Sequence, residues 1–164
     1  GQQGYGYIVS QLQEEIGNIL GISHEYKSIL IGAGNLGRAI AAHMATAVNG
    51  FRLCGIFDNS PQKIGISLAG IPVQDIAALD EFCRREKPVM AVLCIPREAV
   101  GSLSDQLYSL GIHSFWNFSH FDLSMKYPDA IVENVHLNDS LMTLCYRLSD
   151  CGQPEEKQSP TGRG

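Results

Sequence analysis

The sequence lacks the common signatures of metal and disulfide chemistry. It has no C-x-x-C pair and no H-x-x-x-H pair, and its five cysteines are an odd number. Cys54, Cys94 and Cys145 lie in apolar or helical surroundings, where cysteine behaves as a small apolar side chain. We therefore expect reduced thiols in a cytosolic protein, with no disulfide framework and no zinc site.

Long apolar runs and basic residues are also scarce. No apolar stretch approaches the roughly 18 residues of a membrane span, and no charged and then apolar leader opens the chain. The 12 Lys and Arg against 17 Asp and Glu give a net charge of −5. Because a basic surface is needed to bind a nucleic-acid backbone, these residues by themselves are not expected to bind one. The absence of an initiator Met at Gly1 is expected of a fragment of a longer protein.

Short apolar runs alternate with amphipathic segments along most of the chain. The expected strands are Ser28–Ile31, Phe51–Phe57, Gly70–Val73, Val89–Ile95, Phe115–Phe118 and Ile131–Val135. The expected helices are Ile8–Leu20, Leu36–Val48, Asp75–Arg85 (capped by Asp75), Arg97–Leu110 (ended by Gly111) and Ser140–Leu148. This alternation predicts an α/β fold, a doubly wound parallel sheet of the Rossmann type. Residues 151–164 are rich in polar residues, Gly and Pro, and a disordered tail is expected there.

A complete G-x-G-x-x-G motif joins the first of these strands to the second helix. Gly32 allows the tight turn, Gly34 lets the backbone approach a pyrophosphate, and Gly37 lets the helix pack closely on the strand. The helix N-terminus presents N–H groups and a partial positive charge to the phosphates. The motif residues expected to bind a dinucleotide are Gly32, Ala33, Gly34, Asn35, Leu36 and Gly37.

An acidic residue ends the next strand. Asp58 lies 21 residues after Gly37, where a carboxylate accepts hydrogen bonds from the adenine ribose and repels a 2′-phosphate. We therefore expect NAD, as NADH and NAD⁺, rather than NADP. Asn59 belongs to the same turn, for which a merely polar turn is the alternative. Lys63 is expected to reach the adenosine or phosphate groups, although a solvated surface lysine is an equally good interpretation.

Two later strand ends complete the expected site at the carboxyl edge of the sheet. They contribute Cys94, Ile95 and Pro96 from one strand and Asn117 and Phe118 from the next. The backbone there, with the amide of Asn117, is expected to line the nicotinamide half, and ordinary strand-to-loop turns are the alternative. Trp116 adjoins Asn117, so NADH is expected to quench its emission.

The chain leaves little length for catalysis. A dehydrogenase needs a further body of chain that holds the substrate and supplies an acid–base group, yet the expected dinucleotide unit already takes residues 28–135. We therefore expect a domain that senses a redox cofactor and is not an enzyme. The alternatives are the nucleotide-binding domain of an NAD-dependent dehydrogenase, the CoA-binding domain of an acyl-CoA synthetase, and a structural domain that only mediates dimerisation.

Residues 26–150 resemble the C-terminal, NAD(H)-binding domain of the Rex family of redox-sensing transcriptional repressors. The matching stretches are Gly32–Ala39, Gly55–Asp58, Lys63–Gly65, Trp116–Phe118 and Val132–Leu137. Residues 1–25, with Gly4-Tyr5-Gly6-Tyr7 and the helix that follows, resemble the end of that family's N-terminal winged-helix domain. Most of the winged-helix domain is missing from this sequence.

The resemblance implies a cytoplasmic homodimer without membrane contact. Such a repressor binds operator DNA through its N-terminal domain and releases the DNA when NADH binds. The resemblance also implies that the last helix, Asp139–Ser149, is exchanged between protomers; the alternative is that it packs on its own sheet. Two departures concern the redox switch. His43 stands where some members carry Tyr, and both His136 and Asp139 fall near the position of an acidic interdomain residue.

Overall fold

The computed structural model describes residues 25–46 and 50–152. Its strands are β1 (Tyr26–Ile31), β2 (Phe51–Asp58), β3 (Ser67–Leu68), β4 (Ile71–Asp75), β5 (Met90–Leu93), β6 (Ser114–Asn117) and β7 (Ile131–Asn134). Its helices are α2 (Asn35–Thr46), the 3₁₀ turn η1 (Ile76–Ala78), α3 (Leu79–Glu86), α4 (Arg97–Ser109), α5 (Leu123–Lys126) and α6 (Leu137–Gly152). The expected helix Ile8–Leu20, nearly all of the expected winged-helix remnant and most of the expected tail lie outside the described residues.

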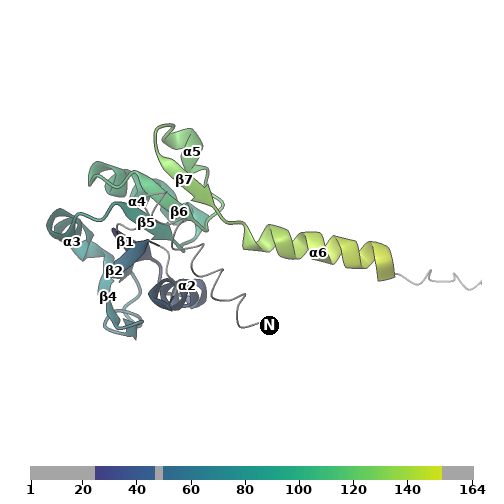
Figure 1. Ribbon diagram of the computed structural model, residues 1–164, viewed down its shortest axis with the longest axis horizontal. Helices are drawn as coiled ribbons and strands as arrows, with labels where there is room; N and C mark the ends of the chain where they lie inside the picture. The colour runs from purple at the N-terminus through teal and green to yellow at the C-terminus, as the bar shows by residue number, and fades with distance from the viewer. Residues whose placement is uncertain (1–24, 47–49, 153–164) are drawn as a thin grey trace, which may run out of the picture.

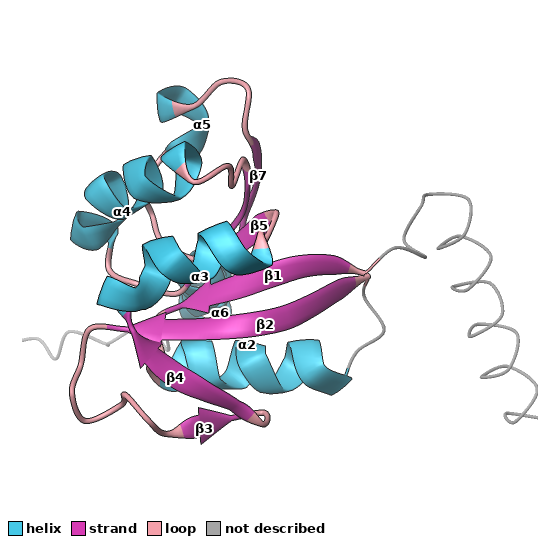
Figure 2. Cartoon of the chain, turned by 90° about the vertical axis from the view of Figure 1, so that its left-hand side faces the viewer, coloured by secondary structure: helices cyan, strands magenta, loops and turns pink. Residues whose placement is uncertain are grey.

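The strands form one sheet in the order β3-β4-β2-β1-β5-β6-β7 (Figure 2). Neighbouring strands are parallel except for β3 and β4, which are antiparallel. The chain builds outward from β1 first on the β2 side and then on the β5 side. The expected doubly wound α/β sheet is thereby confirmed. Such sheets bind ligands beyond the carboxyl ends of the strands, where the strand order reverses, which here is between β1 and β5.

Helices cover both faces of this sheet. In Figure 2, α3 and α4 lie on one face and α2 lies on the other. Strand β1 is buried on both sides: Ile29 and Ile31 belong to the core beneath α3 and α4, whereas Leu30 belongs to the core beneath α2. A strand buried on both faces has a continuous apolar sequence, which is the pattern of Ser28–Ile31.

Short elements are the main difference from the sequence expectations. β3 has two residues and α5 has four, so both are too short for a recurring apolar pattern to show in the sequence. The Asp75 side chain accepts a hydrogen bond from the Ala77 N–H at 3.0 Å, as expected of a cap. However, the first turn after Asp75 is the 3₁₀ turn η1, and α3 begins only at Leu79. Gly111 follows α4 with φ +92°, as expected of a residue that ends a helix.

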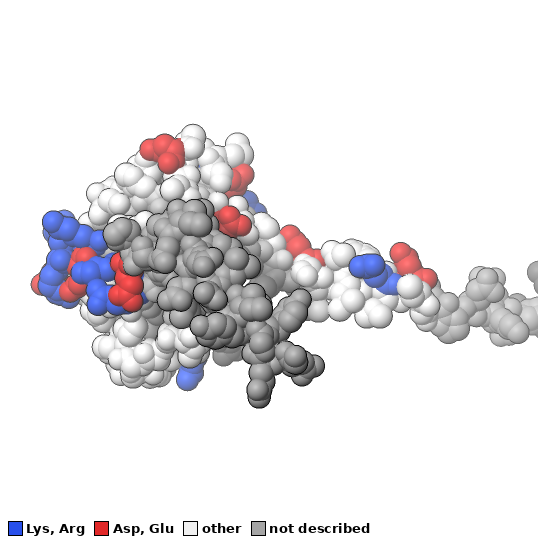
Figure 3. Space-filling model, in the orientation of Figure 1, with Lys and Arg blue, Asp and Glu red and all other residues white. Residues whose placement is uncertain are grey.

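Helix α6 extends away from the sheet (Figure 1). None of its residues is buried, so the alternative that it packs on its own sheet is wrong. Its large apolar side chains are 45–65% exposed, namely Leu137, Leu141, Met142, Leu144, Tyr146 and Leu148. Figure 3 shows the helix as a mostly uncharged rod. No helix within residues 25–46 and 50–152 combines the length and apolar character that a membrane span requires.

The first turn of α2 lies against the turn that follows β1. A Cβ on Gly37 would lie 1.8 Å from the carbonyl oxygen of Gly32, and a Cβ on Gly32 would lie 2.2 Å from the carbonyl oxygen of Cys94. Gly32 also has φ +102°, a conformation that favours glycine. Both clashes are with backbone atoms, which cannot rotate aside as a side chain can. Gly32 and Gly37 are therefore required by the fold itself, as the motif predicts.

We expect Gly37→Ala to lower the free energy of unfolding by about 3 kcal/mol or more, because the added Cβ forces α2 away from the glycine turn. Gly101→Ala, inside α4, is the matched control, since its Cβ would meet only the Phe121 ring at 3.7 Å. The control should keep its stability or gain up to about 1 kcal/mol. Urea denaturation measures both variants, and equal stabilities would contradict the packing role of Gly37.

Candidate functional site

A cavity of about 570 Å³ lies at the carboxyl edge of the sheet, at the point where the strand order reverses. It is lined by Ile31, Gly32, Gly34, Asp58, Asn59, Ser60, Lys63, Ile76, Cys94, Ile95, Pro96, Ala99, Ser102, Leu103 and Gln106. The sequence-predicted site residues among them are Gly32, Gly34, Asp58, Asn59, Lys63, Cys94, Ile95 and Pro96. Three segments far apart in the sequence thus meet at one cavity, as expected from the strand ends.

Gly34 differs from the other two glycines of the motif. Among the described residues other than its chain neighbours, a Cβ built on Gly34 would meet only the Lys63 Nζ within 4 Å, at 3.7 Å. The protein's own packing therefore does not require a glycine here. The Gly34 carbonyl accepts the first hydrogen bond of α2, from the Arg38 N–H at 2.9 Å, so this open space adjoins the helix N-terminus. A helix N-terminus carries unpaired N–H groups and a partial positive charge, which together suit a phosphate.

The Asp58 carboxylate connects the end of β2 to the glycine turn. Its Oδ2 accepts a hydrogen bond from the Ala33 N–H at 2.7 Å, and its Oδ1 accepts one from the Ser60 N–H at 2.8 Å. Each carboxylate oxygen can accept more than one hydrogen bond, so further acceptor capacity faces the cavity. This is the chemistry needed to bind the vicinal hydroxyls of a ribose beside the phosphate position.

Lys63 lines the cavity opposite the glycine turn and is the one cationic side chain among its described lining residues. It is half-buried in the turn after β2, where its N–H donates to the Ser60 carbonyl at 3.0 Å. In the part of the chain that the structure describes, its ammonium group has no ion-pair partner. An anionic ligand at Gly34 would therefore meet both the start of α2 and this ammonium group.

Cys94 lines the same cavity without the properties of a reactive thiol. Burial raises the pKa of its thiol to about 12, so the thiol stays protonated at neutral pH. Burial likewise raises the pKa of Cys83 to about 11. With Ile95 and Pro96, Cys94 forms an uncharged wall of the cavity. The structure thus supports the expectation of structural rather than redox-active cysteines at this position.

One face of α4 forms a wall that the sequence analysis did not include. Ala99, Ser102, Leu103 and Gln106 line the cavity, together with Ile76 from η1. These α4 positions are spaced by three or four residues, so they share one side of the expected helix. Two features of the sequence could have indicated this wall: the helical spacing of these residues, and the start of α4 directly after Pro96, which already belonged to the predicted site. Ile76 and Leu103 give the cavity an apolar side opposite the polar groups of β2.

The remaining predicted residues do not line this cavity. Ala33, Asn35, Leu36 and Gly37 belong to the glycine turn and the start of α2. The Ala33 N–H donates to Asp58, and Gly37 packs against the Gly32 carbonyl. Phe118 is half-buried in the core beneath α2. The binding roles predicted for these residues remain predictions.

The Asn117 side chain is fully buried and already hydrogen-bonded. Its Nδ2 donates to the Phe121 carbonyl and to Asn134 Oδ1, each at 2.9 Å. Its Oδ1 accepts from the Ser119 N–H at 3.1 Å and the Ser119 hydroxyl at 2.6 Å. These bonds use both donors of the amide and occupy its carbonyl oxygen. In this structure Asn117 therefore organises the ends of β6 and β7, and its predicted contact with nicotinamide remains a prediction.

Trp116 lies on the opposite face of β6 from Asn117. It lines a separate groove with residues of α2 and of β1, β2 and β7, and its ring packs edge-on against Phe118 with centroids 4.8 Å apart. Adjacent residues of a strand point to opposite faces, which is why sequence adjacency to Asn117 misled the placement of this ring. The expected quenching of Trp116 emission by NADH remains a prediction.

Comparison with known proteins agrees with this geometry. Residues 23–121 match the family model of the CoA binding domain. The redox-sensing transcriptional repressor Rex of Thermoanaerobacter sp. (strain X514) is 45% identical over 150 residues, which are 92% of this chain and 66% of that protein. The Rex repressor of Clostridium perfringens (strain SM101 / Type A) is 43% identical over 149 residues, or 91% of this chain and 70% of that protein. The chain thus spans about two thirds of the length of the curated relatives it matches.

Solved structures give the same relationship. The crystal structure of RSP, a Rex-family repressor, is 41% identical with a TM-score of 0.73, and the match covers 87% of this chain and 68% of that one. RSP in complex with β-NADH gives a TM-score of 0.75, as does RSP in complex with β-NAD⁺ and operator DNA. The resemblance inferred from the motifs is therefore confirmed: the chain contains a CoA binding domain and belongs to the Rex family of redox-sensing transcriptional repressors.

Proposed function

We propose that this chain is the NAD(H)-sensing part of a repressor that releases operator DNA when NADH binds. The observation that carries the proposal is the contrast within the glycine motif. Gly32 and Gly37 are required by backbone packing, whereas Gly34 faces an open cavity between the α2 N-terminus and Lys63. Only a ligand that approaches the backbone closely, such as a pyrophosphate, gives that glycine a role.

Asp58 supports NADH and NAD⁺ over other nucleotides. A carboxylate at the end of β2 binds the ribose hydroxyls and repels a phosphate on the same ribose. NADPH and CoA both carry a phosphate on their adenosine ribose. The crystal structures of RSP with β-NADH and with β-NAD⁺ and operator DNA support the same cofactor and the same switch in a relative.

We propose that residues 1–25 end a winged-helix domain and that residues 26–150 form the NAD(H)-binding domain with its C-terminal helix. The tail expected at residues 151–164 would begin only after Gly152, where α6 ends. The operator contact would be made by the winged-helix domain. On the face shown in Figure 3, Lys and Arg gather near α3 among acidic residues, and Lys27 pairs with Glu86 at 3.0 Å. Such a mixed surface is unsuited to a DNA backbone. A repressor of this kind would act in the cytoplasm, where bacterial operators lie.

We further propose that the chain has no enzymatic activity. Hydride transfer to a substrate requires a group that moves a proton at the reacting atom. Among residues 25–46 and 50–152, the titratable side chains that line the cavity are Asp58, Lys63 and Cys94. Asp58 is engaged by two backbone N–H groups, and the raised pKa of Cys94 leaves its thiol protonated. A cofactor bound here would be sensed through its binding, without hydride transfer to a substrate.

CoA is the one competing ligand that a specific observation favours, because the matching family model is that of the CoA binding domain. The glycine turn alone does not separate the two ligands, since both contain a pyrophosphate. The Asp58 carboxylate does, through its repulsion of the 3′-phosphate of CoA. We therefore place NAD(H) first.

We expect Gly34→Val to weaken NADH binding by about 100-fold or more, because the new side chain fills the space at the α2 N-terminus where the pyrophosphate must lie. Its stability should change little, since no backbone atom of the protein lies near that Cβ. Isothermal titration calorimetry measures the affinity, and Gly101→Ala is the folded control that keeps wild-type binding. Unchanged affinity in Gly34→Val would contradict the proposed phosphate position.

Helix α6 supports a homodimer. An isolated helix of 16 residues is marginally stable in water, and this one exposes its large apolar side chains. A second copy of the chain is the partner we propose, with α6 exchanged between protomers.

Truncation after Asn138, which removes α6 beyond its first two residues, should convert the dimer to a monomer in sedimentation velocity. Truncation after Gly152 keeps α6 complete and should leave the dimer unchanged. A dimer that persists without α6 would contradict the exchange.

A further inference from the structure

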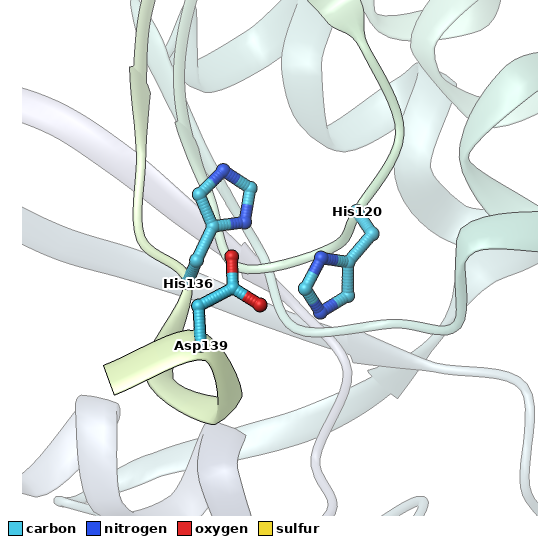
Figure 4. A group of neighbouring side chains, drawn as sticks. All are labelled: His120, His136 and Asp139. Carbon is cyan, nitrogen blue, oxygen red and sulfur yellow. The ribbon is translucent and has the colours of Figure 1, made fainter. Parts of the chain in front are cut away.

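Three metal-ligating side chains converge beside the start of α6. His120 comes from the loop after β6, His136 from the connection between β7 and α6, and Asp139 from the first turn of α6. Each residue offers one ligand atom, these three atoms all lie within 4.8 Å of one another, and all three side chains are exposed. Figure 4 shows the two imidazole rings and the carboxylate directed toward a common space.

The fold holds the segments that carry these side chains. Buried Asn117 bonds to Ser119 and to the Phe121 carbonyl, the two neighbours of His120 in the sequence. The same residue bonds to Asn134 through its side chain and accepts the Val135 N–H on its backbone carbonyl at 2.9 Å. A single buried amide thus fixes both the loop of His120 and the strand end that leads to His136. The segments that carry the two histidines are therefore held close together by hydrogen bonds to Asn117.

Nothing else in the described residues accounts for the three polar groups. Their side chains make no hydrogen bond or ion pair within residues 25–46 and 50–152, and the contact between them is a stack of the His120 and His136 rings, with centroids 5.1 Å apart. Two imidazoles beside a carboxylate form a donor set that suits Zn²⁺ and similar transition-metal ions, whereas Mg²⁺ and Ca²⁺ prefer oxygen ligands.

The ligand atoms would have to move closer to hold an ion. Zn²⁺ binds histidine nitrogen and carboxylate oxygen at about 2.0–2.2 Å in tetrahedral geometry, so two ligands of one ion lie roughly 3.4 Å apart. The three ligand atoms lie within 4.8 Å of one another, and rotation of the exposed side chains would have to supply the rest of the approach. Three protein ligands leave one or more positions of the ion open to water or a further ligand.

We propose that His120, His136 and Asp139 bind a divalent transition-metal ion of the Zn²⁺ class. This proposal departs from the expectation of no zinc site, which considered only spacings close in the sequence. His136 and Asp139 are three residues apart at a helix start, but the third ligand lies 16 residues before His136 and is brought near only by the fold. A bound ion would tie the root of α6 to the carboxyl edge of the sheet.

The test is calorimetric titration of the full chain with Zn²⁺. The exposed thiols of Cys145 and Cys151 also bind zinc, so all proteins carry Cys145→Ser and Cys151→Ser. His136→Ala and Asp139→Ala should each weaken Zn²⁺ binding by about 100-fold or more, at least as much as the loss of an outer-shell partner costs. His43→Ala removes an exposed histidine outside the cluster and should bind as the parent does. Mg²⁺ should not bind measurably.

Zn²⁺ affinity that is the same in the parent, His136→Ala and Asp139→Ala would overturn the site, as would the absence of Zn²⁺ binding by the parent. Thermal unfolding without metal checks that the variants are folded, and Zn²⁺ should raise the midpoint of the parent and of His43→Ala alone. NADH titration of the same proteins is a separate readout, so this proposal and the proposed cofactor can fail independently.

Discussion

The Asp58 carboxylate joins the end of β2 to the glycine turn after β1, and the geometry of the cavity depends on this connection. One oxygen accepts the Ala33 N–H and the other accepts the Ser60 N–H. On its other side the glycine turn is confined in two ways: the Cys94 carbonyl leaves no space for a side chain on Gly32, and the Gly32 carbonyl leaves none on Gly37 at the start of α2. The proposed phosphate and ribose positions are therefore held by one connected set of backbone contacts.

The same sheet edge connects the cavity to α6. The residues directly after β5 line the cavity, and the Leu93 carbonyl at the end of β5 accepts the Phe118 N–H at 3.0 Å, just beyond the end of β6. Asn117 then joins β6 to the end of β7, from which α6 begins. The exposed helix thus starts two strands away from the cavity, on a part of the sheet that is held by buried hydrogen bonds. A change at the cofactor edge has a short, rigid structural route to the element we propose forms the dimer.

Periodicity and motif spacing predicted the doubly wound parallel sheet, and they predicted the glycine turn and strand ends that line the cavity. The two-residue β3 and four-residue α5 were missed because they are too short for a recurring apolar pattern to show. The α4 wall was missed because its residues, such as Leu103 and Gln106, carry no signal beyond helical spacing. Trp116 lines a different face of the sheet from Asn117, although the two are adjacent in the sequence, because neighbouring residues of a strand face opposite sides. The histidine cluster depends on contacts across 16 residues of sequence, which spacing rules do not represent.

The most direct test of the account is the nucleotide selectivity that Asp58 confers. Calorimetric titration of the full chain with NADH, NADPH and CoA should show tightest binding for NADH, because only NADH has both hydroxyls of its adenine ribose free. In Asp58→Ala, NADH should bind more weakly and its advantage over NADPH should shrink. Tighter binding of CoA than of NADH, or an NADH-to-NADPH ratio unaffected by the loss of the carboxylate, would contradict the account.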